Sequence, residues 1–263
     1  MNDPHVSTIR YRLELGNVSY VPPVDERSFT LADFDFAING TDITVRPRIH
    51  FPDREAACAA AETHIRAWEL EAGIRLCIPR LRIIYQETDI IDRAPTPGVN
   101  LLITENMRLT STIDDAILIR HIAEYPPPPD ADFVISPDVE TMWQRYVGYL
   151  EGREPLLAMA YFCFTLLKGK NGCSQVAWSL NTEEQILHKL SDLSSTRGDA
   201  SIGRKANLSP LTSEEHGWVD QTVRALIIQL AKSSAGPPAD SLKMDDLPKL
   251  SNLAASRHIR GDL

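Results

Sequence analysis

The sequence predicts an α+β protein, with a mainly antiparallel sheet and one amphipathic helix first, and a C-terminal all-α four-helix bundle after it. Apolar patterns of period two surround a single long helical pattern before residue 125, and the strong patterns after residue 136 are helical. Between them lies Pro126–Pro129, a run typical of a stiff spacer. The predicted organisation is an α+β domain at 1–125, a Pro-rich linker at 126–135, a helical bundle at 136–235 and a mobile tail at 236–263.

The clearest local prediction is a β-hairpin at Asn39-Gly40, a dipeptide flanked by alternating apolar residues. Pairing outward from that turn places Phe36 opposite Ile43 on one face. The same register places Asp33 opposite Arg46 on the other face, where opposite charges favour the pairing.

One helix and further strands complete the predicted N-terminal domain. Residues 53–73 form the helix, because apolar residues from Cys58 to Ala72 recur at steps of three and four, and Gly73 ends the pattern. Additional strands are expected at 10–15, 80–85 and 99–104, and the strand before the hairpin starts or bulges near Ala32. Residues 116–122 fit a strand or a short helix, and a strand is favoured.

Residues 136–235 are predicted to form four helices. Pro137 follows a capping Ser136, and the segments that begin at Thr182 and Thr212 each carry a capping-box pattern. Between the helix that starts at Pro137 and the segment that starts at Thr182, residues 156–167 are apolar on every side apart from a few hydroxyls. This helix is therefore expected to be covered on every side as the centre of the bundle.

Composition narrows the class of protein. The chain has 43% apolar and 24% charged residues, as globular soluble proteins do, and contains no apolar run of spanning length and no signal-peptide pattern. Four scattered cysteines favour a reducing cytoplasm. The net charge of −9 does not indicate RNA as a partner, although RNA binding by a local patch stays open. No metal-ligand spacing or cofactor motif is present, so neither a metal nor a cofactor is predicted.

The loop at 194–205 is the first candidate site. It joins two capped helices and contains two glycines, small hydroxyls and three cations, which could hold phosphate. Its charged residues are Arg197, Asp199, Arg204 and Lys205. The alternative is a solvated connection whose cations offset helix dipoles.

A row of arginines is the second candidate. Three pairs of arginines sit two residues apart on proposed strands and therefore share a face: Arg10 and Arg12, Arg46 and Arg48, and Arg80 and Arg82. If those strands are neighbours, the face suits carboxylates or phosphates. The alternative is ion pairing with Glu14, Asp33 and Asp35 on a solvated face.

An α+β domain followed by a helical bundle with a long polar loop before its last helix resembles the HEPN-containing proteins, over roughly 137–232. The resemblance implies a bundle that dimerises and acts on RNA. That family's catalytic signature is Arg followed by His after four to six residues, and no Arg here has His at that spacing. Arg197 and Arg204 occupy the corresponding place, and the next His is His216.

Three functional hypotheses follow. The first is a non-catalytic, cytoplasmic interaction or regulatory protein that binds a ligand or a partner through its α+β domain and forms a homodimer through its bundle. The aromatic residues Trp143, Tyr146 and Tyr149 would serve that interface. The second is a ribonuclease-like enzyme using Arg197, Asp199, Arg204 and His216. The third is a small-anion sensor using Arg46, Arg48, Arg80 and Arg82.

Overall fold

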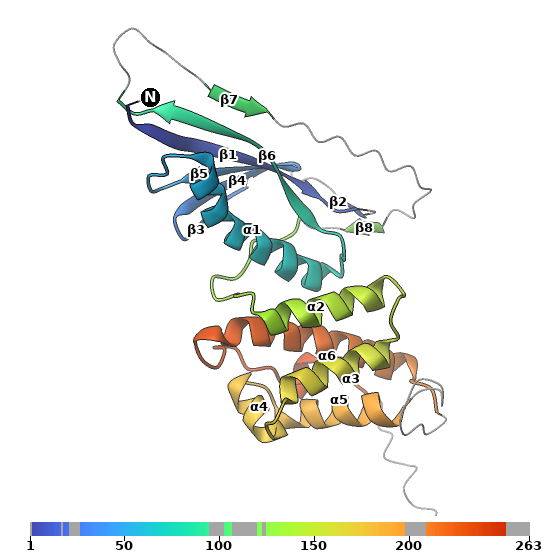
Figure 1. The fold of residues 1–263 in the computed structure, drawn as a ribbon. Coiled ribbons are helices and arrows are strands. Elements are labelled where there is room, and N and C mark those ends of the chain that lie inside the picture. The colour runs from blue at the N-terminus through green and yellow to red at the C-terminus, as the bar shows by residue number, and fades with distance from the viewer. Residues whose placement is uncertain are drawn as a thin grey trace, which may run out of the picture. The chain divides into compact units, whose positions relative to one another are not determined.

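A computed structural model of the chain describes residues 2–16, 18–20, 27–94, 103–106, 120–122, 125–197 and 209–250. The chain divides into two compact units, Met1–Ala131 and Asp132–Leu263. Unit 1 combines an antiparallel sheet with one long helix, and the α-helices of unit 2 follow it in sequence (Figure 1). The predicted α+β class is therefore confirmed.

Unit 1 is built on a six-stranded sheet within the described residues, in the order β3-β4-β5-β1-β6-β7, with every pairing antiparallel. Its strands are β1 (Pro4–Glu14), β3 (Arg27–Leu31), β4 (Phe34–Asn39), β5 (Asp42–Pro47), β6 (Arg82–Asp92) and β7 (Ile103–Asn106). Two short strands, β2 (Val18–Tyr20) and β8 (Arg120–Ile122), form a separate parallel pair. Strands β5, β1 and β6 are thus direct neighbours.

The predicted hairpin exists as β4 and β5, but its predicted register is wrong. Asn39 pairs with Asp42, so the turn residues are Gly40 and Thr41. Gly40 has φ +60°, which suits the first central position of a type II′ turn. Phe36 consequently lies opposite Val45. The error is two residues, and a shift of two leaves each side chain on its predicted face, because side chains alternate with period two.

The same shift changes the predicted ion pair: Asp35, and not Asp33, lies opposite Arg46. Asp33 instead belongs to a second hairpin, which joins β3 to β4 through Ala32 and Asp33. Ala32 there has φ +49°, uncommon for a residue with a side chain. Of the two expectations near Ala32, a strand start or a bulge, the first is confirmed, because the chain reverses there and β4 starts at Phe34.

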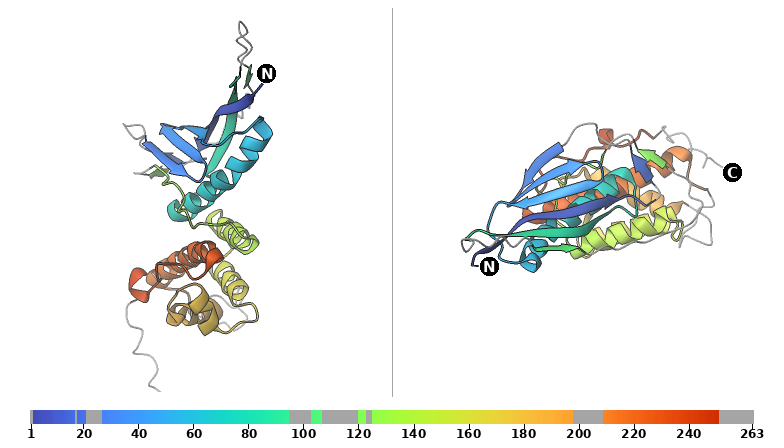
Figure 2. Two further views of the ribbon diagram at one scale, coloured as in Figure 1. Left: turned by 90° about the vertical axis from the view of Figure 1, so that its left-hand side faces the viewer. Right: turned by 90° about the horizontal axis from the view of Figure 1, so that it is seen from above.

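Helix α1 (Arg54–Leu76) packs on one face of this sheet (Figure 2). It begins at Asp53, whose carboxylate accepts from the Ala56 N–H. The prediction that Gly73 ends the helix is wrong. The helix continues for another turn to Cys77, which adopts the left-handed conformation of a C-cap at φ 54°. Gly73 is an interior residue whose carbonyl accepts the N–H of Ile78.

The core of unit 1 lies between α1 and the sheet. Trp68 is buried at its centre, where its ring meets Phe29 and Phe36 edge-on. The small residues Ala57 and Ala61 on the same face are fully buried and let α1 approach the strands closely. These contacts hold α1 rigidly in place along the sheet, which positions the site described below.

The proline run belongs to unit 1 and is attached to α1. The carbonyl of Pro126 accepts the indole N–H of Trp68 at 3.3 Å. Just after the run, the N–H of Asp130 donates to Glu71 at 2.8 Å, and the Asp130 carboxylate pairs with Arg75. Proline has no backbone N–H, so the run cannot join a strand ladder as a donor. Side chains of α1 hold the run in place instead.

Unit 2 contains five α-helices within the described residues, where the sequence predicted four. They are α2 (Pro137–Leu150), α3 (Leu156–Lys168), α4 (Cys173–Ser179), α5 (Glu184–Thr196) and α6 (Ser213–Lys232), with 3-10 turns at Ser233–Ala235 and Met244–Asp246. The additional helix is the short α4. The four-helix bundle itself stays a prediction. None of the described helices is both long enough and apolar enough to cross a membrane.

One of the two predicted capping boxes is present. The Thr212 side chain accepts from the Glu215 N–H, and the Glu215 carboxylate accepts from the Thr212 N–H. The box predicted at Thr182 is wrong. Its hydroxyl donates to the Leu180 carbonyl, and its backbone forms a bridge to Leu242, so α5 begins without a side-chain cap.

Helix α3 contacts each of the other α-helices of unit 2. Met159, Ala160 and Cys163 on one side are fully buried. The expectation that α3 is covered on every side is wrong, because Tyr161 on another side is 44% exposed. Part of the remaining apolar surface is covered by a cation: the Arg145 guanidinium of α2 lies 4.3 Å from the ring centre of Phe162.

Residues 236–250, predicted to be part of a mobile tail, pack on unit 2. Leu242 and Leu247 are buried. The Asn181 amide donates to the Pro238 carbonyl at 2.8 Å, and the N–H of Glu183 donates to the Leu242 carbonyl. The remainder of the predicted tail, 251–263, lies outside the described residues.

Candidate functional site

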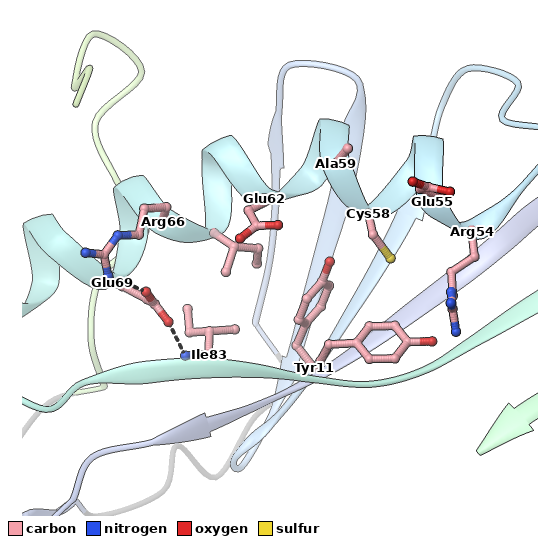
Figure 3. Close-up of a pocket in the computed structure, with 11 residues that line it drawn as sticks. Tyr11, Arg54, Glu55, Cys58, Ala59, Glu62, Arg66, Glu69 and Ile83 are labelled. Carbon is pink, nitrogen blue, oxygen red and sulfur yellow. Dashed lines mark hydrogen bonds and ion pairs between the residues drawn. The ribbon is translucent and has the colours of Figure 1, made fainter. Parts of the chain in front are cut away.

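A groove of about 540 Å³ runs between α1 and strands β1 and β6, a volume within the range of small-molecule sites (Figure 3). Most of the residues that line it carry a polar or charged group. They come from α1 (Arg54, Glu55, Cys58, Glu62, Arg66 and Glu69), from β1 (Tyr11) and from β6 (Tyr85). Ala59, Ile65 and Ile83 supply apolar surface.

The sequence of α1 explains why polar groups line the groove. Arg54, Cys58, Glu62 and Arg66 recur at steps of four, which places them along one side of a helix. This polar stripe runs beside the apolar stripe that faces the core. The helix therefore anchors itself with one stripe and presents the adjacent stripe to the groove.

The floor of the groove is a connected set of polar side chains. The Cys58 thiol makes hydrogen-bonding contacts with the side chains of Tyr11 and Thr88. Thr88 Oγ1 lies 3.0 Å from the hydroxyl of Tyr85. The rings of Tyr11 and Tyr85, cross-strand partners, meet edge-on with centroids 6.1 Å apart. Each polar atom of this floor is thus engaged by a neighbour, as buried polar groups require.

Glu69 closes one end of the groove. Its carboxylate accepts the Ile83 N–H at 2.7 Å and the Arg66 guanidinium at 2.9 Å, and Arg82 lies 3.5 Å away. The Ile83 N–H belongs to strand β6, so a helix side chain satisfies a donor of the sheet. These bonds assign Glu69 a structural role.

The Cys58 thiol and the Tyr11 hydroxyl at the floor of the groove are uncharged. Burial raises the pKa of the Cys58 thiol, against the opposing effect of its contacts with Thr88 and Tyr11. Burial also raises the pKa of Tyr11, and the nearby thiol and Glu62 add to that shift. Both groups are protonated at neutral pH. Because the thiolate is the nucleophilic form, this cysteine is a poor nucleophile.

The arginine face is largely paired with acids. Strands β5, β1 and β6 are neighbours, as that hypothesis requires. However, Arg10 pairs with Glu87 and with Asp89, the latter at 2.6 Å, and Arg12 lies 3.4 Å from Asp42. The alternative of ion pairing therefore describes these two arginines, although Glu87, Asp89 and Asp42 replace the partners expected from the sequence.

The other arginines of that face are dispersed. Arg46 lies in β5 opposite Asp35, and Arg82 begins β6 and reaches Glu69. Arg48 follows the end of β5, and Arg80 precedes β6, so neither belongs to a strand. The small-anion sensor stays a prediction.

The loop candidate is described only at its edges. Arg197 donates to Glu215 at 3.0 Å, and the Glu215 side chain is 2% exposed and also caps α6. His216 is exposed, with its ring 6.2 Å from that of Tyr149. Asp199, Arg204 and Lys205 lie outside the described residues. The structure thus brings Arg197 to the residue before His216 and gives its guanidinium a structural partner.

No protein-family model, curated protein or solved structure matches the chain. The resemblance to HEPN-containing proteins therefore stays a prediction, as does RNA cleavage by Arg197 and His216. Among the residues that the structure describes, no three His, Cys, Asp or Glu side chains are placed to hold a metal ion.

Sequence reasoning missed the groove. It placed Cys58 in the apolar stripe of the helix, whereas Cys58 is half-buried at the groove floor. The four-residue steps from Arg54 to Arg66 were the available signal for a second stripe. The floor had no local signal, since Tyr11 and Tyr85 come together only through pairing of β1 with β6.

Proposed function

We propose that the protein is a non-catalytic regulatory protein, in which unit 1 binds a small organic molecule and unit 2 mediates self-association. The groove between α1 and β6 carries the proposal, because its volume and its mixture of aromatic, apolar and charged lining suit a small ligand. Binding is favoured over chemistry because the thiol contacts Tyr11 and Thr88, and the Tyr85 hydroxyl contacts Thr88.

Exposed aromatic side chains of unit 2 support the self-association. Trp178 on α4 is 72% exposed, and Tyr161 on α3 is 44% exposed. Tryptophan and tyrosine are enriched at the energetic centres of interfaces. The aromatic residues of α2 are less suitable, since Tyr146 donates to Asp220 of α6 and Tyr149 meets His216 of α6.

Ligand binding is tested by cysteine footprinting. A fragment panel is screened by thermal shift and native mass spectrometry, and hits are incubated with the protein and N-ethylmaleimide at pH 8. A groove ligand should slow labelling of Cys58, while Cys77 and Cys173, which are half-buried elsewhere, serve as internal references. Labelling of Cys58 that no stabilising hit slows would place the binding elsewhere and contradict the proposal.

A matched pair of variants gives a second test of ligand binding in the groove. Ala59 lines the groove, whereas Ala56 is exposed on α1 outside the lining. Ala59→Trp should weaken every groove ligand and Ala56→Trp should leave affinities unchanged. Equal affinities for both variants would count against the groove.

Self-association is tested by light scattering and native mass spectrometry over a concentration series. Wild-type protein should form a dimer, and Trp178→Ser should shift it to monomer. Val134→Ser is the control, since Val134 is 48% exposed on the segment before α2. A strict monomer at high concentration would refute this part of the proposal.

A further inference from the structure

The carboxylate of Glu62 is the distinctive charge of the groove. It points from the middle of α1 toward the side of the groove where Tyr11 lies (Figure 3). Its charge contributes to the raised pKa of Tyr11 and of Cys58, so it acts on both groups of the floor. The Glu62 side chain is exposed, and its charge is felt by the Tyr11 and Cys58 side chains. It is therefore available to a ligand.

The neighbouring arginines on the Glu69 side of the groove pair with Glu69. Arg66 donates to Glu69 at 2.9 Å, and Arg82 lies 3.5 Å from the same carboxylate. Glu69 is further held by the Ile83 N–H. Two guanidinium groups are thus directed at the one carboxylate of Glu69, and Glu62 and Glu55 are further carboxylates of the lining.

Arg54 acts at the other end of the groove. It precedes Glu62 by two helical turns, about 12 Å along the axis at about 1.5 Å per residue. Its positive charge lowers the pKa of Cys58, which lies between the two, and outweighs the opposite effect of Glu62 there. Tyr11 is influenced by Glu62. The carboxylates of Glu62 and Glu69 thus lie toward the end of the groove away from Arg54 (Figure 3).

Aromatic and apolar surface lies next to Glu62. The rings of Tyr11 and Tyr85 meet edge-on, and Ile65 and Ile83 flank them. An aromatic face attracts a cation, and a carboxylate beside it adds direct charge pairing. The apolar side chains offer contact to an uncharged body.

We infer that the groove is selective for an organic cation: an amine whose ammonium group lies at Glu62 and whose aromatic or apolar body covers Tyr11, Tyr85 and Ile83. This inference rests on the proposed function of the groove and adds the class of ligand. The acidic character of residues 1–130, with a net charge of −7, favours the approach of such a cation.

Three probes with one body test the charge. Tryptamine, tryptophol and indole-3-propionate share an indole on a short alkyl chain and carry a positive, neutral and negative group. Binding is measured by calorimetry and by protection of Cys58 from N-ethylmaleimide. Tryptamine should bind about fivefold more tightly than tryptophol, as one partly exposed charge pair gives, and indole-3-propionate should bind most weakly.

Two variants then test whether Glu62 supplies the negative charge that favours tryptamine. Glu62→Gln should remove the advantage of tryptamine and leave tryptophol unchanged. Glu14→Gln makes the same change of charge at an exposed position of β1 and should alter neither affinity. An advantage of tryptamine that survives Glu62→Gln, or tighter binding of indole-3-propionate, would overturn the inference while leaving the groove as a binding site. Failure of all three probes to protect Cys58 would overturn the proposed groove function as well.

Discussion

Helices α1 and α3 are each the centre of a unit, but they present different surfaces. Helix α1 buries Ala61 and Trp68 against a sheet and turns Cys58 and Glu62 toward a groove. Helix α3 is apolar along nearly its whole length, and Cys163 lies fully buried where α3 packs among the other helices. A helix that is apolar throughout therefore indicates where helices pack together. A polar stripe beside an apolar stripe indicates a helix surface that a ligand can reach.

The largest expected effect contrasts two sides of α3. Met159→Asp places a carboxylate at a fully buried position and should cost about 5 kcal/mol or more of unfolding free energy, because a buried unpaired charge is strongly unfavourable. Tyr161→Asp, at the 44% exposed position, should cost less than about 1 kcal/mol. Hydrogen exchange of peptides from α3, read by mass spectrometry, measures both. Similar losses for the two variants would show that α3 has no exposed side.

The corresponding change in α1 is Trp68→Ala. It removes the fully buried ring that meets Phe29 and Phe36 and should cost about 3–5 kcal/mol. Thr63→Ala, at an exposed position of the same helix, should be nearly neutral. Urea unfolding followed by far-UV circular dichroism measures the difference. A loss below 1 kcal/mol for Trp68→Ala would mean that this ring does not anchor α1.

Two carboxylates of α1, Glu69 and Glu62, should also differ in how much their removal lowers the free energy of unfolding. Glu69→Ala removes the acceptor of the Ile83 N–H and of Arg66, and should cost about 2–3 kcal/mol. Glu62→Ala should change the unfolding free energy by less than about 0.5 kcal/mol, since its side chain is exposed. The two unfolding midpoints in urea decide the matter. Equal midpoints would remove the distinction between a structural carboxylate and a ligand-facing one.

The smallest expected effect is the alkaline pH dependence of the two helices' cysteines. Burial raises the pKa of Cys163 in α3 to about 12, and burial also raises that of Cys58 in α1. A pKa that folding raises favours the protonated native state, so this stability is complete below the unfolded pKa of about 8.5 and is lost as pH rises toward the folded pKa.

Between pH 7 and pH 10 the contribution of Cys163 should therefore fall by about 2 kcal/mol. Cys163→Ala should flatten the dependence of unfolding free energy on pH by that amount, and Cys58→Ala should flatten it to a smaller extent. Denaturant unfolding at a series of pH values provides the measurement. A pH profile unaltered by Cys163→Ala would contradict the burial of its thiol.

Local patterns in the sequence predicted much of unit 1 and of the helices. Alternation of apolar residues predicted the faces of β4 and β5, and the apolar stripe predicted most of α1. The capping box at Thr212 predicted the start of α6. These features succeed because they depend on neighbours within a few residues, where helical and strand periods fix which side chains share a face.

Tertiary structure decided the register, the groove and the roles of the charges. Pairing of β1 with β6 brings Tyr11 and Tyr85 together beneath Cys58, and no pattern within α1 encodes which strands lie under it. Likewise, Glu62 and Glu69 lie on the same helix, and the contacts of Glu69 with the Ile83 N–H and Arg82 of strand β6 distinguish a structural carboxylate from one that faces the groove. Sequence periodicity determines what a helix or strand presents, while contacts between distant segments determine what that surface meets.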